Sequence, residues 1–469
     1  MSKNVCVVGA GAAGLTAALR AAEAGARVTL LNAHPKIGLK ILMSGGTRCN
    51  VTHREVSERD YHGGSRPFVA RVLRAFTVLQ TLEWFDALGV ALKLEETGKY
   101  FPASDDAQTV LDAVVGAVEK AGVDVRCGAR VVRVERVGEA GGAGAVGGSR
   151  GAPAAAGAVG EAGVAASPRF RIGIQNVADS AAFAEVSAVG RTHWEPLAVE
   201  PDTWIDADAV IIATGGLSFP RTGSDGTGYA LVESLGHTLE PTVPALTPLA
   251  ADDLLCRTAQ GVTHDVELSL WRGTKRVETV PGSMLLAHFG YTGPAALDLS
   301  RHWMRASLEA REDAGAAPLR VTANFLPGMT RETLLERWLY VGTRDSRANV
   351  RRFLAASMPD RLALELSRES GVHPTMSLSQ VSKAARAALI MRVVERELPV
   401  TGTLGYEKAE VTAGGVRLSE VNPSTLESRV APGVFLCGEV LDVEGRLGGF
   451  NFQWAWSSGT VAGRAAESK

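Results

Sequence analysis

The glycine spacing near the amino terminus constrains the fold of this chain more than any other feature of the sequence. Val5–Val8 is a short apolar, β-branched run, and Leu15–Ala24 is an alanine-rich stretch that ends at Gly25. Arg27–Leu31 follows as a second apolar run. Strand, glycine turn, helix and strand in this order form a βαβ unit, whose parallel strands require a sheet covered by helices. The sequence therefore predicts an α/β fold with a Rossmann-like parallel sheet.

The turn between the first strand and the helix carries Gly9, Gly11 and Gly14 in a G-x-G-x-x-G spacing. In such a turn Gly9 permits the tight bend, Gly11 lets the backbone approach a pyrophosphate, and Gly14 allows close packing of helix on strand. The first N–H groups of the helix and its dipole favour an anion at the same place. We expect this turn, with Ala13, to bind a dinucleotide; the alternative is a purely structural glycine turn.

Asn32 stands at the end of the second strand, where an acidic residue that binds ribose hydroxyls is expected. Its amide oxygen can accept a hydrogen bond from a ribose hydroxyl, but without the assistance of a charge. The usual argument for a 2′-hydroxyl over a 2′-phosphate is weaker here. The glycine motif by itself therefore does not identify the cofactor.

The size and charge of the chain exclude several classes of protein. A length of 469 residues predicts two or three domains. The 49 basic and 51 acidic side chains leave a formal charge of −2, so no overall field attracts nucleic acid or membrane. The five cysteines include no C-x-x-C pair, which argues against disulfides and zinc and favours a reducing cytoplasm. No apolar run approaches the ~20 residues that span a bilayer.

The first part of the chain continues with alternating helices and strands. One helix is expected around Leu79–Leu88 and another around Val110–Val118, both packed on the sheet. The predicted strands that follow are Arg130–Val137, Arg169–Ile174 and Asp208–Ala213. Between the first two, residues 138–167 are almost all Gly and Ala and lack the large apolar side chains that offset ordering entropy. We expect residues 138–167 to be a disordered insertion.

The character of the sequence changes between Pro241 and Val400. Strand-like pieces appear here, followed by arginine-bearing helices; they are Asp265–Trp271, then Arg331–Leu339, Ser346–Ala356 and Leu378–Glu397. Strand, glycine turn and helix return at Gly433–Gly463. The sequence therefore predicts a discontinuous dinucleotide-binding domain, residues 1–240 and 401–469, with an inserted domain at 241–400.

The segment Gly38–Asn50 reads GLKILMSGGTRCN. It resembles the signature G-R-K-x-x-x-S-G-G-G-R-C-N of the YhiN/BaiN-like flavoprotein family, with Leu39 in place of Arg and Thr47 in place of Gly. Further matches follow in the family's order at Lys99–Val114, Ile211–Tyr229, His288–Ala295, Glu410–Val416 and Phe435–Gly463. The resemblance implies FAD bound in an extended form by the Rossmann-like domain, with a β-barrel-like and partly helical domain inserted. Residues 138–167 have no match.

Other residues are expected to contact this cofactor. Ser44, Gly45 and Gly46 offer a hydroxyl and unhindered amides, suited to the pyrophosphate or the flavin edge. Lys40 and Arg48 can neutralise phosphate charge, although most such side chains are simply exposed. Gly438 and Glu439 resemble the Gly-Asp pair that holds the ribityl chain in this flavoprotein class. The remaining expected contacts are Val132, Ala213, Thr214 and Gly215, and, before or at the start of the last helix, Gly448, Gly449, Asn451 and Gln453.

Catalytic side chains are harder to predict. Cys49 lies inside the signature and is a candidate proton donor, but cysteine is commonly a small packed hydrophobe. His288 and Tyr291 lie on a glycine-punctuated loop of the inserted region and are candidates to face a substrate. The alternative for both is a structural role.

The resemblance implies three kinds of reaction: reduction of an enone in oxidised bile acids, of a uridine in ribosomal RNA, or oxidation of aminoacetone. We expect a reductase, with RNA uridine favoured because residues 301–400 hold 16 basic and 11 acidic side chains. Arg344, Arg347, Arg351 and Arg352 recur there at spacings of a helical basic face; the alternative is an ordinary solvated helix. A flavin-containing binding or sensory protein is the other class. NAD(P)H is the expected electron donor, without a motif that supports it.

Overall fold

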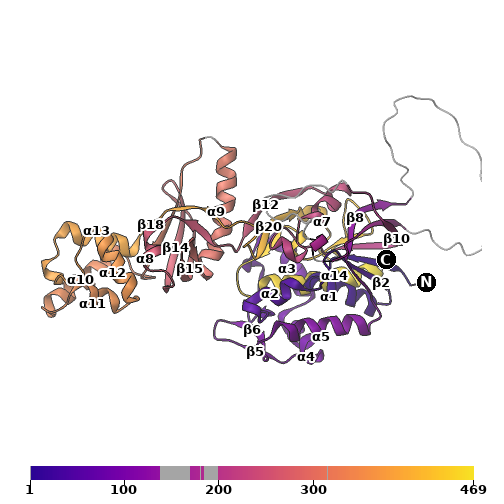
Figure 1. Ribbon diagram of the computed structural model, residues 1–469, viewed down its shortest axis with the longest axis horizontal. Coiled ribbons are helices and arrows are strands. Elements are labelled where there is room, and N and C mark those ends of the chain that lie inside the picture. Colours follow the sequence, from indigo (N-terminus) through magenta and orange to yellow (C-terminus); the bar gives the residue numbers. More distant parts are fainter. Residues whose placement is uncertain (1, 138–168, 180, 184–198, 314, 469) are drawn as a thin grey trace, which may run out of the picture.

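The computed structural model describes residues 2–137, 169–179, 181–183, 199–313 and 315–468. The predicted insertion at 138–167 lies outside the described residues. Figure 1 shows two bodies side by side along the long axis of the molecule. The first body contains both chain ends, and the second body is formed by the residues between β12 (Leu239–Ala245) and β20 (Val411–Val416).

A five-stranded parallel sheet forms the centre of the first body. Its order is β21-β11-β1-β2-β7, so strands from the start, the middle and the end of the chain lie side by side. The strands are β1 (Asn4–Val8), β2 (Arg27–Asn32), β7 (Asp124–Cys127), β11 (Ala209–Ile212) and β21 (Val434–Leu436). The apolar, β-branched strands of the sheet centre are almost fully buried, as expected when helices cover both faces. The predicted Rossmann-like fold is confirmed.

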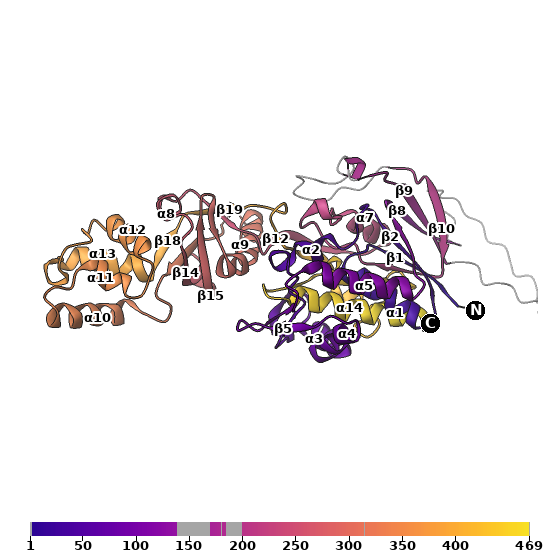
Figure 2. The ribbon, with the colours of Figure 1, turned by 60° about the horizontal axis from the view of Figure 1, so that its bottom comes forward.

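The first and last helices of the chain pack against each other on this sheet. Figure 2 shows α1 (Ala12–Glu23) beside α14 (Phe450–Glu467). A Cβ added at Gly459 would lie 2.5 Å from the Ala13 carbonyl oxygen, and one at Gly463 would lie 2.3 Å from that of Ala17. Two glycines on one face of α14 thus allow direct contact between the backbones of α1 and α14.

Smaller elements surround this core. The helices are α2 (Leu39–Thr47), α3 (Arg66–Ala75), α4 (Val78–Ala87), α5 (Ala107–Lys120) and α7 (Thr227–Ser234). The added strands pair antiparallel: β3 (Thr52–His53), β6 (Lys99–Pro102) and β5 (Leu92–Leu94); β4 (Tyr61–Gly63) and β22 (Val443–Gly445); β8 (Ala129–Arg136), β9 (Phe170–Asn176) and β10 (Thr203–Ala207). One expectation is corrected: α4 packs on α14, β3 and β5 instead of on the parallel sheet.

The second body is an antiparallel sheet with helices at its far end (Figures 1 and 2). Its sheet has the order β18 (Arg396–Leu398), β17 (Leu319–Asn324), β14 (Thr263–Arg272), β15 (Lys275–Ala287), β16 (Gly290–Thr292), β13 (Leu249–Ala251) and β19 (Val400–Thr403). The helices are α8 (Leu254–Thr258), α9 (Pro294–Glu312), α10 (Arg331–Arg344), α11 (Val350–Ala355), α12 (Asp360–Glu369) and α13 (Lys383–Val394). Sequence patterns had indicated α10, α11 and α13 but neither α9 nor α12.

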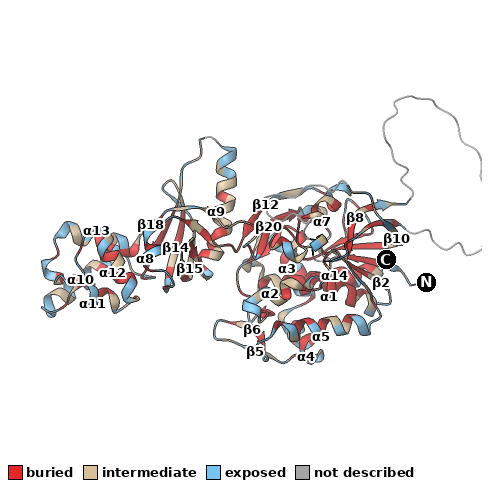
Figure 3. Ribbon diagram, viewed as in Figure 1, coloured by how far each residue is buried: buried red, intermediate tan, exposed pale blue. Residues whose placement is uncertain are grey.

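Two strands carry the chain between the bodies. β12 and β20 pair antiparallel, and they share a small core with Leu246, which directly follows β12. A separate hydrophobic core fills the second body, from Leu249 to Leu398. Figure 3 shows the buried residues gathered within each body. Within the described part of the chain, no helix is both long enough and apolar enough to cross a membrane.

Candidate functional site

A cavity of about 490 Å³ opens in the first body, at the carboxyl ends of the parallel strands. Its wall is built by the turn between β1 and α1, the end of β2, α2, β8, the loop after β11, and the segments that follow β21 and precede α14. The predicted residues that line it are Gly9, Gly11, Ala13, Asn32, Lys40, Ser44, Gly45, Gly46, Arg48, Ala213, Thr214, Gly215, Gly438, Glu439, Gly448, Gly449 and Asn451.

The glycine turn presents free backbone to this cavity. Gly9 has φ +104°, and a Cβ there would lie 2.5 Å from the Ala213 carbonyl oxygen; one at Gly14 would lie 1.8 Å from that of Gly9. A Cβ at Gly11 would meet nothing within 4 Å, because the space in front of it belongs to the cavity. α1 begins after Gly11 without a side-chain cap. Its first N–H groups therefore have room for a bound anion, as the pyrophosphate of a dinucleotide requires.

Asn32 lines the cavity, but its side-chain amide forms hydrogen bonds with backbone groups. Oδ1 accepts a hydrogen bond from Ala10 N at 3.2 Å, and Nδ2 donates to the carbonyl oxygens of His34 at 2.6 Å and Lys36 at 3.0 Å. The predicted ribose contact is corrected to this extent: Asn32 chiefly ties the loop after β2 to the glycine turn, and a neutral amide suits that role better than a carboxylate, which has no donor.

Arg130 is a cavity residue that the sequence analysis missed. The side chain is only 2 % exposed, and Nη2 donates to Asp225 at 2.6 Å and to Thr227 at 2.5 Å. Its Nε and Nη1, and the Thr214 hydroxyl, are buried without a hydrogen-bond partner within the described residues. Such groups are costly unless a ligand satisfies them. They fit a dinucleotide bound at this end of the cavity.

The strand that supplies Arg130 also corrects one predicted contact. Val131 lines the cavity, whereas Val132, one residue further along β8, does not. The pairing of β8 with β9 shifts register between Val131 and Arg133, so the regular alternation of the strand is broken at Val132.

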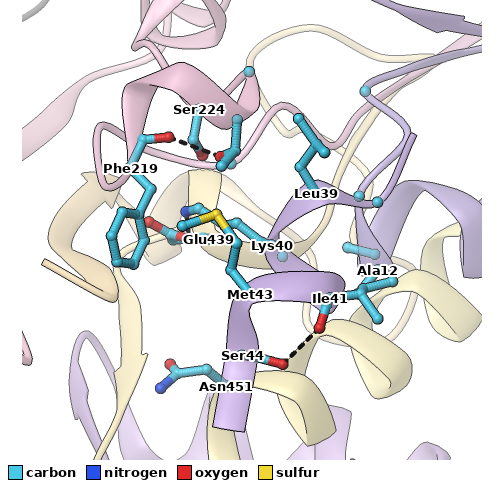
Figure 4. Close-up of a pocket in the computed structure, with 18 of the residues that line it drawn as sticks. Ala12, Leu39, Lys40, Ile41, Met43, Ser44, Phe219, Ser224, Glu439 and Asn451 are labelled. Carbon is cyan, nitrogen blue, oxygen red and sulfur yellow. Dashed lines mark hydrogen bonds and ion pairs between the residues drawn. The ribbon is translucent and has the colours of Figure 1, made fainter. Parts of the chain in front are cut away.

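Lys40 and Glu439 neutralise each other in the middle of the cavity wall (Figure 4). Lys40 Nζ lies 2.8 Å from Glu439 Oε2 and 2.7 Å from the Ser218 hydroxyl. Glu439 Oε1 accepts from that hydroxyl at 2.7 Å and from Thr412 N at 2.9 Å. A carboxylate thus already compensates the charge of Lys40, and the expected contact of Lys40 with a phosphate stays a prediction.

The signature segment interrupts α2 at the cavity. Ser44 is extended, with ψ 152°, and Gly45 and Gly46 have φ +57° and +68°. The Ser44 hydroxyl donates to the Ile41 carbonyl at 2.9 Å, as Figure 4 shows. Arg48 lines the cavity too, but it pairs with Glu95 at 2.7 Å and Asp105 at 3.3 Å. The glycine pair thus offers backbone amides to a ligand, whereas the charge of Arg48 is compensated.

The amino terminus of α14 lies at the cavity as well. The helix begins after Gly449, which has φ +93° and no side-chain cap. Asn451 exchanges hydrogen bonds with the Gly445 backbone, at 2.8 and 2.9 Å. Gln453 does not reach the cavity; its buried amide binds Thr52 at 2.7 Å and Thr81 at 3.1 Å. The predicted contact of Gln453 with the cofactor is corrected accordingly.

The structure does not bring the three predicted catalytic side chains to the cavity. Cys49 is fully buried outside the lining, and burial raises the pKa of its thiol to about 12. Tyr291 is buried in the second body, where its hydroxyl binds Asp253, which in turn pairs with Arg396 at 2.7 Å. His288 is exposed in the turn between β15 and β16. The positions of Cys49, His288 and Tyr291 therefore favour a structural role over a catalytic one.

Two charged residues that we had not predicted line the cavity instead. Glu410 precedes β20, and Lys99 begins β6. The Glu410 side chain is accessible from the cavity, yet protein atoms surround it, and this desolvation raises its pKa to about 7. Both residues stand at the edges of motifs quoted above, so the signal was present. The sequence did not show that these two residues lie in the same cavity.

The predicted basic face of the second body is not continuous. Arg344 ends α10, Arg347 lies in the following loop, and Arg351 and Arg352 belong to α11. Arg351 is bound to Asp360 through two hydrogen bonds of 2.6 Å. All four side chains are exposed, but they come from separate elements, because the helix begins later than the spacing indicated.

Comparisons with known proteins agree with this site. The chain matches the HI0933-like protein Rossmann domain family over residues 3–147 and 178–465. It is 32% identical, over 99% of both chains, to 3-dehydro-bile acid delta(4,6)-reductase of Clostridium scindens. It is 31% identical to the ribosomal RNA dihydrouridine synthase of Escherichia coli, over 97% of this chain and 96% of that protein. Among solved structures, a 3-ketosteroid-delta4-(5alpha)-dehydrogenase from Rhodococcus jostii RHA1 is 14% identical, with TM-score 0.47 and coverage of 100% and 97%.

The fold, the cavity and the relatives together define an FAD-dependent oxidoreductase. The chain belongs to the HI0933-like family of Rossmann-domain proteins. The resemblance found in its motifs is thereby confirmed.

Proposed function

We propose that this protein is an FAD-dependent reductase that delivers hydride to a C=C bond conjugated with a carbonyl group. The strongest support is the cavity, into which two uncapped helix amino termini open, those of α1 and α14. One suits the pyrophosphate, and the other suits a ring system that gains negative charge on reduction.

The relatives support the reaction type. One is named a reductase of bile acids and the other a synthase of dihydrouridine in ribosomal RNA, and both align with nearly the whole chain. A 3-oxo-diene and a uracil ring share a C=C bond in conjugation with a carbonyl. Hydride transfer to a conjugated C=C bond can therefore account for both reactions.

The residues of this chain divide the work of binding. Bound FAD, once reduced, would supply the hydride through flavin N5. The Gly9–Ala13 turn, Thr214 and Arg130 suit the adenosine diphosphate half. Gly45, Glu439 and the start of α14 suit the ribityl chain and the ring. In this arrangement the protein binds, orients and electrostatically stabilises the cofactor.

Among substrates, we propose uridine in RNA ahead of a small enone, with a nicotinamide as electron donor. The support is the group of exposed arginines on the second body, of which Arg347 and Arg352 have no ion pair among the residues that the structure describes. Figure 1 shows α10 and α11 at the end of the second body that is far from the first body, so only a large substrate such as an RNA would contact both these arginines and the cavity.

The test is an anaerobic reaction of the purified, FAD-loaded protein. Reduced with dithionite, it is offered ribosomal RNA without dihydrouridine, a 4-en-3-one steroid, or no acceptor. We expect rapid reoxidation by RNA, with dihydrouridine in the product. Reoxidation by the steroid alone would show that the substrate is a small enone and would leave the proposed reduction of a C=C bond unchanged. Reduction of the oxidised protein by aminoacetone, without reoxidation by either acceptor, would contradict the proposal.

A further inference from the structure

Glu410 and Lys99 differ from the charged pairs on the cavity wall. Lys40, Arg48 and Arg130 each form an ion pair with a carboxylate. Neither the Glu410 carboxyl nor the Lys99 ammonium makes a hydrogen bond or ion pair within the described part of the chain. Two accessible opposite charges, left unpaired in one cavity, are available to a ligand.

Both residues lie at the end of the cavity where α14 begins. Lys99 is close to Gly448, since a Cβ added at that glycine would lie 3.5 Å from Lys99 Cε. Glu410 donates its backbone N–H to the Leu246 carbonyl oxygen at 3.1 Å, at the point where the chain leaves and re-enters the first body. The pair therefore lies between the helix terminus suited to the flavin ring and the crossing to the second body.

The second body contributes a third titratable group. Asp298 of α9 accepts a hydrogen bond from Leu447 N at 2.7 Å, and burial raises its pKa to about 6. Desolvation raises the pKa of Glu410 to about 7, the positive charge of Lys99 opposes this rise, and the negative charge of Asp298 adds to it. A carboxyl that titrates near neutral pH is suited to give up a proton during turnover.

We propose that Glu410 is the proton donor of the reduction and that Lys99 faces the carbonyl oxygen of the substrate. This inference rests on the proposed function. The substrate β-carbon accepts two electrons as hydride from the reduced flavin, and the π electrons move toward the carbonyl oxygen, whose negative charge the Lys99 ammonium stabilises. The α-carbon then takes the proton of Glu410, which becomes a carboxylate and is reprotonated from water. A nicotinamide donor restores the reduced flavin.

The first experiment compares Glu410→Gln, Glu410→Asp and the exposed control Glu119→Gln on α5. Single-turnover reoxidation of the dithionite-reduced protein is followed with the acceptor that works for the wild type. We expect Glu410→Gln to slow this step by ~10²-fold or more, with flavin content and acceptor Kd unchanged, and Glu410→Asp to retain part of the rate. A Glu410→Gln rate within about threefold of the wild type overturns the inference.

A second readout does not depend on turnover. The oxidised wild-type protein and Glu410→Gln are compared by infrared spectroscopy over a range of pH. Their difference should contain one protonated-carboxyl band that titrates near pH 7, whereas bands of other buried carboxyls such as Asp298 should be present in both proteins. Lys99→Met should move the titration of the difference band to higher pH, because it removes a positive charge that lowers the pKa of Glu410. The absence of a carboxyl band from this difference, or an unmoved titration in Lys99→Met, contradicts the assignment.

The two proposals fail in different ways. If no C=C acceptor reoxidises the wild-type protein, the proposed function is wrong. If the wild type is reoxidised and Glu410→Gln is equally fast, the reaction stands and only the proton donor is wrong.

Discussion

At the scale of single residues, the cavity is defined as much by absent side chains as by those present. A Cβ at Gly11 would point into open space, although those at Gly9 and Gly14 would collide with neighbouring backbone. Gly9 and Gly14 are therefore required by the fold, whereas the space in front of Gly11 is free for a ligand. Substitutions at different glycines of this one turn can therefore test ligand binding and folding separately.

Gly11→Val should fold and lose FAD, because a branched side chain would fill the space in front of the first N–H groups of α1. The flavin absorbance of the purified and reconstituted protein measures this loss. Gly116→Ala, in the middle of α5, is the control and should keep the cofactor. Stoichiometric FAD in a folded Gly11→Val protein would refute the assignment.

Arg130→Met should destabilise the protein, because it leaves the buried carboxylate of Asp225 without its cation. Breaking a buried pair by removing one partner costs about 3–5 kcal/mol. Urea unfolding should show most of this loss, and Arg130→Met combined with Asp225→Asn should recover part of it. A double variant no more stable than Arg130→Met would contradict the ion-pair explanation.

At the scale of elements, contacts between distant segments hold the cavity in shape. α1 and α14 come from opposite ends of the chain and meet through Gly459 and Gly463. Both helices present their amino termini to the cavity. The distance between the helices therefore also fixes the distance between the two sites for negative charge.

Gly463→Val should lower stability, because its Cβ would lie 2.3 Å from the Ala17 carbonyl oxygen and push α14 away from α1. Overpacking of this kind costs about 1–3 kcal/mol. Thermal unfolding measures the effect, and FAD should bind more weakly as the two amino termini separate. An unchanged Tm would show that the helices are free to shift.

At the scale of the whole molecule, a buried polar cluster joins the two bodies. Arg301 and Arg305 of α9 reach Glu444 and Asp442 of the first body; the Arg305–Asp442 separation is 3.7 Å. Desolvation raises the pKa of Asp442 to about 6, and the nearby negative charge of Glu444 adds to this rise. We therefore expect the stability of this contact between the bodies to depend on pH.

The sign of this linkage follows from the raised pKa of Asp442. A carboxyl whose pKa is higher in the folded than in the unfolded state contributes stability at low pH, and this is lost as pH rises through about 4 to 6. Asp442→Asn should remove this part of the decline, and Asp86→Asn on the exposed side of α4 should not. Urea unfolding from pH 4 to pH 7 is the measurement; a parallel decline in Asp442→Asn would contradict it.

The proposed binding of RNA would involve surfaces of the whole molecule. Arg347→Ala and Arg352→Ala should each weaken RNA binding and reduce the slope of log affinity against log salt by about 0.7–0.9, if each contacts one phosphate. Arg351→Ala should have a smaller effect, because Asp360 already holds that guanidinium. Binding titrations at several salt concentrations test this order. Equal slopes in all variants would remove the support for an RNA substrate.

Local sequence patterns determined the parts of this protein that depend on neighbours in the chain. The βαβ unit and the glycine turn follow from residue spacing, since period and backbone freedom are local properties. The cofactor class followed only from the resemblance of the motifs to a flavoprotein family. The α9 and α12 helices were missed although each carries an apolar face at helical spacing, through Leu299 and Trp303 in α9 and through Leu362 and Leu366 in α12.

Only the tertiary structure determined which charged side chains of the cavity lack an ion-pair partner within the described residues. Lys40 forms an ion pair with Glu439, which lies 399 residues away in sequence, and the amide of Asn32 binds the backbone. Neither contact could be predicted from the motifs. Cys49 is buried outside the cavity lining, whereas Glu410 and Lys99, far apart in sequence, both line the cavity. Compensation of charge and access to a cavity depend on distances between segments remote in sequence, and these distances exist only after the chain has folded.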